Sequence, residues 1–406
     1  MTAFLWVAEN GEFLAERWLA GQPAGVPICL LHAPNASGAA RAMQQRHPAI
    51  REALILDGAG EGTEQLRLLL SGNSEARIVL PLSLEMRPLR YRPTVLTPHV
   101  APHYDLVRTL WKAGFRELVF HNLNGEHRLA LPHLLDEFAG VHRGRRCFVV
   151  GNGPSLNEID MGRLRDEITL GSNRCYLGYE RWGFPFTYWG ISDTYQIQEY
   201  AQEYVASIPG DTVKFFPFEY EALLPVDQAC PVNLGLCRAA AHAFSDRPER
   251  LYAGHTVTHM LLQVAAIMGC DPIILIGADH RYDVKPPSLP RKAARRMHRY
   301  MTRRTQDSAP YRMIEAAYLA WRTGRTRAVE AGRGFWNVTD PASPTHFDAR
   351  YTNQGQRRFR LPEPGEAEAD FACALRWADA RGVRIVNATP NSALDVFPKV
   401  TYDELF

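Results

Sequence analysis

Two runs of four apolar residues, Cys147–Val150 and Ile273–Ile276, constrain the fold of this chain more than any other feature. A continuous apolar run is typical of a strand that is buried on both faces, as in a parallel sheet covered by helices. The run His259–Met268, which precedes the second of them, is expected to form a buried helix. Further strands of the same sheet are predicted at Ile168–Gly171, Tyr188–Ile191, Val213–Pro217 and Val383–Asn387.

The first third of the chain also alternates apolar runs with amphipathic segments. Helical patterns cover Gly62–Leu70 and His103–Ala113. The expected strands are Phe4–Val7, Pro27–His32, Ala53–Asp57, Arg77–Leu82, Thr94–His99 and Glu117–His121. Repeated strand and helix indicate a Rossmann-like domain, but no G-x-G-x-x-G follows its first strand, so no dinucleotide is assigned.

The chain has 406 residues, which favours two domains. We expect an α/β fold with two Rossmann-like domains whose parallel sheets face a central cleft. The first would cover residues 1–140 and the second residues 145–406, with a basic insertion at about 284–330.

Composition excludes several functional classes. The net charge of +2 gives no reason to expect nucleic acid as a partner. The seven cysteines include no C-x-x-C pair, which argues against a zinc cage or a disulfide framework. The N-terminus has no signal-peptide pattern, and no window approaches the roughly 20 apolar residues of a membrane span. A cytoplasmic protein is therefore expected.

The loop Gly151-Asn152-Gly153-Pro154-Ser155 follows the first apolar run directly. Glycines let the backbone approach a ligand, and exposed N–H groups favour anionic oxygen, so a strand end of this kind is a candidate nucleotide site. The loop is neither a P-loop nor a Rossmann fingerprint. The alternative is a tight turn between a strand and a helix.

Polar residues follow four more of the expected strands. Because the carboxyl ends of parallel strands share one edge of a sheet, these groups are expected to converge on one crevice. They are Gly171-Ser172-Asn173-Arg174, Gly190-Ile191-Ser192-Asp193, Gly277-Ala278-Asp279-His280 and Asn387-Ala388-Thr389-Pro390.

The order of these motifs, together with Thr256-Val257-Thr258 and His346-Phe347-Asp348, resembles the MptE-like domain family, named after 6-hydroxymethylpterin pyrophosphokinase. That family is similar to the Maf flagellin glycosyltransferases and to the bacterial sialyltransferases that use CMP-sialic acid. The resemblance covers residues 145–406. It implies a nucleotide site that includes Asn152, Gly153, Pro154, Ser155, Asn173, Thr256, Thr258, Asp279 and Tyr282. The argument from the strand ends adds Gly151, Ser192 and Asp193 to the predicted nucleotide site.

The resemblance also implies a histidine that acts as general base in the segment Pro344–Tyr351, which points to His346. Where the sialyltransferases carry their later, catalytic histidine, this chain has Arg350. A neutral imidazole can take a proton from an acceptor hydroxyl, and Asp348 could orient it. The alternatives are a histidine that only bonds a loop carbonyl, and His280 as the base.

No metal ligand is predicted, because no D-x-D motif is present. Asp279 is either an anchor or a magnesium ligand, and Asp193 raises the same question. The basic stretch Arg291–Arg304 is either a solvated helix face or a contact with an anionic membrane surface, which would place the protein peripherally at the inner face of the membrane.

These observations favour a glycosyltransferase that uses a nucleotide-activated sugar, with a CMP-linked nonulosonic acid as donor. The acceptor would be a surface glycan, a lipid-linked saccharide or a protein, and no cofactor would be required. The alternative is an ATP-dependent pyrophosphokinase acting on a pterin-like alcohol, which would need Mg²⁺. A non-catalytic sensor of nucleotide sugars is a third reading.

Overall fold

A computed structural model describes about three fifths of the chain. The described residues are 2–6, 28–32, 45, 50–55, 77–81, 86–89, 92–98, 104–112, 117–122, 125–235, 242–281, 335–336, 346–353, 359–360 and 364–406. The predicted helix at 62–70, Tyr282 and the basic stretch 291–304 lie outside them.

Contacts along the chain define two compact units. One comprises residues 1–138, 197–206 and 213–233, and the other comprises residues 139–196, 207–212 and 234–406. The domain boundaries and the cleft expected from the sequence stay predictions.

The first unit contains a six-stranded sheet with the order β3-β2-β4-β1-β7-β8. All its strand pairs are parallel except the last, β7 with β8. A separate antiparallel pair consists of β5 (Met86–Leu89) and β6 (Arg92–Pro98), and helix α4 spans Tyr104–Lys112. The strands of the sheet are β1 (Thr2–Trp6), β2 (Ile28–His32), β3 (Ile50–Ile55), β4 (Arg77–Pro81), β7 (Glu117–Asn122) and β8 (Gly125–Ala130).

The strand ends predicted to carry the nucleotide site belong to a seven-stranded sheet with the order β13-β12-β11-β10-β9-β16-β19. Every strand pair of this sheet whose register is described is parallel. Its strands are β9 (Cys147–Val150), β10 (Ile168–Ser172), β11 (Tyr188–Gly190), β12 (Val213–Pro217), β13 (Ala229–Val232), β16 (Ile273–Ile276) and β19 (Ile385–Asn387). The predicted α/β class and parallel sheet are confirmed.

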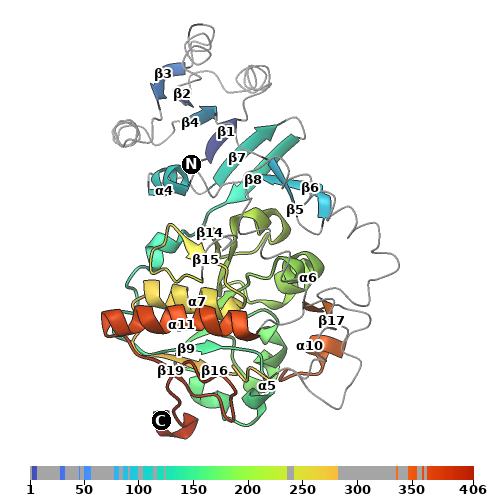
Figure 1. The fold of residues 1–406 in the computed structure, drawn as a ribbon. Helices are drawn as coiled ribbons and strands as arrows, with labels where there is room; N and C mark the ends of the chain where they lie inside the picture. The colour runs from blue at the N-terminus through green and yellow to red at the C-terminus, as the bar shows by residue number, and fades with distance from the viewer. Residues whose placement is uncertain are drawn as a thin grey trace, which may run out of the picture. The chain divides into compact units, whose positions relative to one another are not determined.

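Helices α7 (Val257–Ile267) and α11 (Pro364–Arg381) pack on each other, and α7 also contacts β9 and β10 (Figure 1). Ten of the eleven residues of α7 are buried, and seven of these ten are apolar, as expected for a helix in the core. Thr256 caps its N-terminus, and Gly269 follows its end with a φ of +76° that favours glycine.

The remaining described helices are α5 (Tyr179–Trp182), α6 (Thr194–Ser207) and α10 (Arg350–Asn353). The 3₁₀ turns are Leu135–Phe138, Pro154–Asn157, Met161–Leu164, Cys175–Gly178, Phe218–Leu223 and Tyr402–Leu405. Two short pairs, β14 (Leu234–Gly235) with β15 (Leu251–Tyr252) and β17 (Phe335–Trp336) with β18 (Phe359–Arg360), complete the elements. Within the described part of the chain, no helix is long and apolar enough to cross a membrane.

Candidate functional site

The strand order places a topological switch point at β9. The chain runs from β9 to β10 on one side, and strand β16 later takes the place on the other side. In open α/β sheets, ligands bind beyond the carboxyl ends of the strands at such a point. A ligand site is therefore expected at the loops that follow β9, β10 and β16.

The loop 151–155 is closed against the turn that follows β16. Gly153 N donates to the Gly277 carbonyl over 2.9 Å, and Gly151 N donates to the Ile276 carbonyl over 2.8 Å. A Cβ atom on Gly153 would lie 1.7 Å from Asp279 Oδ2, and one on Gly151 would lie 2.3 Å from Gly277 O. The glycines are therefore required by the close approach of two loops.

Asp279 anchors the same loop. Its carboxylate accepts hydrogen bonds from Ser155 Oγ at 2.6 Å and from Ser155 N at 3.2 Å. Burial raises the pKa of Asp279, and the two bonds from Ser155 oppose that rise. The N–H groups of Gly151, Gly153 and Ser155 all donate within the protein, so the binding role predicted for this loop would fall on its side chains.

Two asparagines at neighbouring strand ends have unused acceptors. Asn152 donates through Nδ2 to the Ser172 carbonyl at 3.1 Å and to Ser172 Oγ at 2.8 Å, which fixes the orientation of its amide. Its Oδ1 is buried and has no partner among the residues that the structure describes. The same is true of Asn173 Oδ1. A buried acceptor without a partner costs about 1–3 kcal/mol, so two of them at neighbouring strand ends indicate a place for a donor-bearing ligand.

The backbone around Asn173 is held in a defined conformation. Its φ is +47°, a left-handed value that asparagine tolerates better than most residues. Its N–H donates to the Gly190 carbonyl, and its own carbonyl accepts from Trp189 Nε1 at 2.7 Å. Its side chain also bonds the hydroxyl of Tyr351. The amide is thus aimed by contacts with β11 and with the segment that carries His346.

The segment 346–351 is attached directly to the loop after β9. Phe347 N donates to the Asn152 carbonyl at 3.0 Å, and Asn157 Nδ2 donates to the Phe347 carbonyl at 2.9 Å. The ring of His346 stacks on that of Tyr351, with centroids 3.8 Å apart and planes 9° from parallel. The structure therefore brings His346 to the same edge of the sheet as Asn152.

Arg174 supplies a fixed positive charge at this edge. The side chain is fully buried and donates through Nη1 to the carbonyls of Arg350 and Tyr351, at 2.8 and 2.7 Å. Burial and the charge of Arg174 lower the pKa of His346 to about 3, so this imidazole is neutral at pH 7. In the sequence, Arg174 stood out only as a member of the polar run Gly171–Arg174. Its position directly after Asn173 is the signal that could have singled it out.

The other predicted catalytic residues have structural partners. The carboxylate of Asp348 bonds the guanidinium of Arg350, which lowers the pKa of Asp348. His280 Nε2 lies 3.1 Å from Glu368 on α11, with a φ of +57° at His280. The partners described for these two side chains are therefore Arg350 and Glu368.

Four more predicted binding residues act as helix caps or neighbours of caps. Asp193 accepts from the N–H groups of Tyr195 and Gln196 at the start of α6, next to Ser192. Thr256 Oγ1 accepts from Thr258 N at the start of α7. These bonds give the polar residues a structural role, whether or not they also face a ligand.

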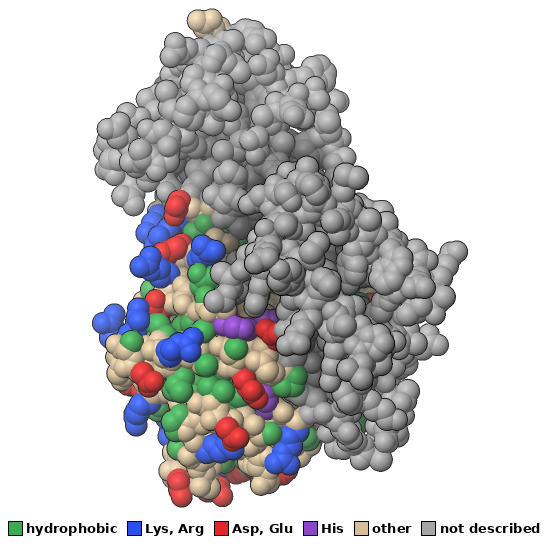
Figure 2. Space-filling view, viewed as in Figure 1, with side chains coloured by type: hydrophobic (Ala, Val, Ile, Leu, Met, Phe, Trp, Pro, Cys, Tyr) green, Lys and Arg blue, Asp and Glu red, His purple; other side chains and the backbone are tan. Residues whose placement is uncertain are grey.

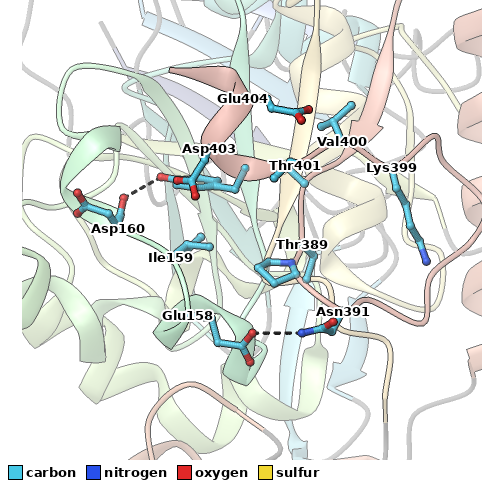
Figure 3. Close-up of a pocket in the computed structure, with 13 residues that line it drawn as sticks. Glu158, Ile159, Asp160, Thr389, Asn391, Lys399, Val400, Thr401, Asp403 and Glu404 are labelled. Atoms are coloured by element: carbon cyan, nitrogen blue, oxygen red, sulfur yellow. Dashed lines mark hydrogen bonds between the residues drawn. The ribbon is translucent and has the colours of Figure 1, made fainter.

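A pocket of about 500 Å³ lies further along the sheet edge, beside the residues that follow β19 (Figure 3). Four carboxylates line it, from Glu158, Asp160, Asp403 and Glu404, against one lysine, Lys399. An excess of negative charge disfavours a phosphate-bearing ligand. We therefore place the candidate nucleotide site at the asparagines and not in this pocket.

Comparisons with known proteins add one finding. No protein-family model matches the chain, and no curated protein matches it either. Among solved structures, the chain aligns with the MAf glycosyltransferase from Magnetospirillum magneticum AMB-1, with 12% sequence identity and a TM-score of 0.37. The alignment covers 100% of this chain and 58% of that protein, so this chain spans less than two thirds of its length.

Proposed function

We propose that this chain is a glycosyltransferase that takes its sugar from a nucleotide-activated donor, most specifically a CMP-linked nonulosonic acid. The observation that carries the proposal is the pair of buried amide oxygens of Asn152 and Asn173 at the switch point of the sheet, neither of which has a partner among the described residues. These two oxygens could accept hydrogen bonds from a ligand that carries N–H or O–H donors.

A cytidine nucleotide has donors of this kind. Its base carries an exocyclic amino group, and its ribose carries two hydroxyls. Amide oxygens that have already been desolvated by the protein bind such donors without a further cost of burial. A ligand made only of phosphate lacks donors of this kind, so it would not satisfy the two amide oxygens.

The leaving phosphate would be stabilised by positive charge that is already in place. The guanidinium of Arg174 is buried beside Asn173, and its bonds to two carbonyl oxygens hold it there. A preorganised charge of this kind stabilises a developing anion without reorganising during the reaction. Tyr282, which the sialyltransferase resemblance assigns to the phosphate, is kept in this proposal as a second donor.

His346 would receive the hydrogen bond of the acceptor hydroxyl. Its pKa of about 3 keeps one ring nitrogen free of a proton throughout the neutral range. Because protonation would place a second positive charge near Arg174, the imidazole acts first as a hydrogen-bond acceptor, and it becomes a stronger base when the negative leaving group is present. The acceptor would be a surface glycan, a lipid-linked saccharide or a protein.

Metal dependence separates this proposal from the pyrophosphokinase. Pyrophosphoryl transfer from ATP relies on magnesium, and its candidate ligands, Asp193 and Asp279, serve here as a helix cap and a loop anchor. We expect the transferase to need no magnesium, because CMP departs with a single phosphate whose charge protein donors can stabilise.

The test is a set of melting curves of the full chain with CMP, CDP and ATP, each in EDTA and in Mg²⁺, compared with the same buffer lacking nucleotide. A ligand of the native state raises the melting temperature. We expect CMP to raise it by the same amount in both buffers. Stabilisation by ATP alone, and only with Mg²⁺, would contradict the proposal and favour the pyrophosphokinase. Binding of CMP without any turnover of CMP-sugars would favour a sensor.

A further inference from the structure

A second cluster of polar side chains lies between α7 and α11, on residues that the proposed function does not use. Asp370 on α11 is 1% exposed, and each of its carboxylate oxygens faces one imidazole. His242 Nδ1 lies 2.7 Å from Oδ1, and His255 Nδ1 lies 2.9 Å from Oδ2. The metal-binding atoms of the three residues all lie within 4.8 Å of one another.

A second carboxylate, that of Glu366, lies near the ring nitrogen of His242 that does not face Asp370. The Nε2 atom of His242 lies 3.5 Å from the carboxylate of Glu366, which precedes Asp370 by one turn of α11. Metal-binding histidines usually donate their second ring N–H to such a carboxylate, which fixes the ring and raises its basicity. The four residues therefore have the arrangement of a metal ligand set with an outer partner.

Buried polar groups of α7 hold the surrounding backbone. The Gln263 amide, fully buried, accepts from the N–H groups of Ser245 and Tyr252 and donates to the Tyr252 carbonyl. His259, also fully buried, bonds the carbonyl of Ala243 at 2.8 Å, next to His242. The segment that carries His242 is therefore fixed before any ion binds, as a preorganised site requires.

Gly254 allows the close approach of these groups. Its φ is +58°, and a Cβ atom there would lie 2.9 Å from Asp370 Oδ2 and 2.7 Å from His259 Cδ2. The backbone N–H of His255 follows and donates to Asp370 Oδ2 at 2.7 Å. The backbone and both rings thus converge on one carboxylate.

We propose that His242, His255 and Asp370 form a binding site for a divalent transition-metal ion of the zinc class. Two imidazole nitrogens and one carboxylate oxygen are donors that suit zinc, whereas magnesium and calcium prefer oxygen throughout. Two metal bonds of about 2.1 Å at a tetrahedral angle separate their ligand atoms by about 3.4 Å, which small rotations of the rings can provide.

Solvent can complete the coordination. The side chains of His242 and His255 are 26% and 34% exposed, while the carboxylate of Asp370 is buried. Figure 2 shows histidine side chains at the surface beside an acidic side chain on this face of the molecule. The bound ion would join the start of α7 to the middle of α11 and to the segment 242–250.

The test is a titration of the chelator-treated full-length protein with ZnCl₂, followed by calorimetry, and with CoCl₂, followed by visible absorption. The variants are His255→Ala and Asp370→Asn. His255→Ala keeps the backbone N–H that bonds Asp370, and it removes a partly exposed ring. The matched control is His133→Gln, which changes another partly exposed histidine that is paired with a glutamate, Glu137.

We expect one equivalent of Zn²⁺ in the wild type and in His133→Gln, with the d–d absorption of four-coordinate Co²⁺. Both ligand variants should bind Zn²⁺ at least about tenfold more weakly, because loss of an outer partner alone costs that much. Wild-type protein that binds no zinc would overturn the proposal, and so would a His255→Ala protein that folds and binds zinc as the wild type does. Either result would mean that Asp370 serves only to hold the two histidines.

Discussion

The loop after β9 has two sides that use their polar groups in opposite ways. On the side of β16, the N–H groups of Gly151, Gly153 and Ser155 are all bonded to the end of this strand or to the turn after it. On the side of β10, the amide oxygens of Asn152 and Asn173 are buried without a partner among the described residues. We call the first the glycine side, where these N–H groups all have partners within the protein. We call the second the asparagine side, where the two amide oxygens have none among the described residues.

The asparagine at the end of β19 supports this distinction. The amide of Asn387 donates to Ser392 Oγ and to the Leu394 carbonyl, and its oxygen accepts from Thr389 N. The same residue type at the same kind of position is therefore satisfied away from the switch point. A glycine-rich strand end indicates close packing as readily as a ligand, whereas an unsatisfied buried acceptor indicates a ligand more directly.

The largest effect should follow from filling the glycine side. Gly153→Ala places a Cβ atom where Asp279 Oδ2 now lies, so we expect a loss of about 3 kcal/mol in the free energy of unfolding. Urea denaturation measures it. The matched control is Gly365→Ala, because a Cβ atom there has no neighbour within 4 Å. Equal stability of the two variants would show that the loops are not in close contact.

A double variant sharpens the same point. If the clash is with the carboxylate, Gly153→Ala combined with Asp279→Ala should lose less stability than the sum of the two single variants. Simple addition of the two losses would place the clash elsewhere.

The second effect concerns pH. In the unfolded chain, His346 has a pKa near its usual value of 6.5, whereas the folded pKa is about 3. Between these values only the unfolded chain binds the proton, so the stability falls as the pH falls. From pH 7 to pH 5 this contribution is about 2 kcal/mol. His346→Gln should lose correspondingly less stability than the wild type over that range in urea titrations, and identical pH profiles would contradict the burial of this ring.

The smallest of these effects distinguishes an anchor from a magnesium ligand. Asp279→Asn keeps one acceptor for Ser155, so a loss of about 1 kcal/mol is expected, with CMP binding unchanged. A magnesium ligand would behave differently: the variant would retain its stability and lose a metal-dependent reaction.

Much of the fold follows from the sequence. The apolar runs predicted β9, β12 and β16 with their observed bounds, because strands buried on both faces contain few polar residues. Strand β13 escaped prediction because Pro231 lies within it, which an outermost strand tolerates. Helix α11 escaped because several of its buried positions are Ala, Asp or Cys, so its apolar periodicity is weak.

The site was harder to predict than the fold. Its strand ends were recognised, but the contact of Ser155 with Asp279 joins residues 124 positions apart, and no local pattern announces it. The cluster of His242, His255 and Asp370 is likewise assembled from distant segments, which is why metal-ligand spacing gave no signal. The burial of Arg174 and the lowered pKa of His346 also depend on tertiary packing alone.

The role of the asparagine side in nucleotide binding can be measured as the CMP affinity of a variant that lacks one of its two amides. Asn173→Gly removes the amide and tolerates the φ of +47°, so the protein should keep its fold. In calorimetric titrations at pH 7 in EDTA, we expect the wild type and Gly365→Ala to bind CMP equally, and Asn173→Gly to bind it about tenfold more weakly through the loss of a buried hydrogen bond. Undiminished CMP affinity in a folded Asn173→Gly protein would contradict the account, as would a wild-type chain that binds no nucleotide.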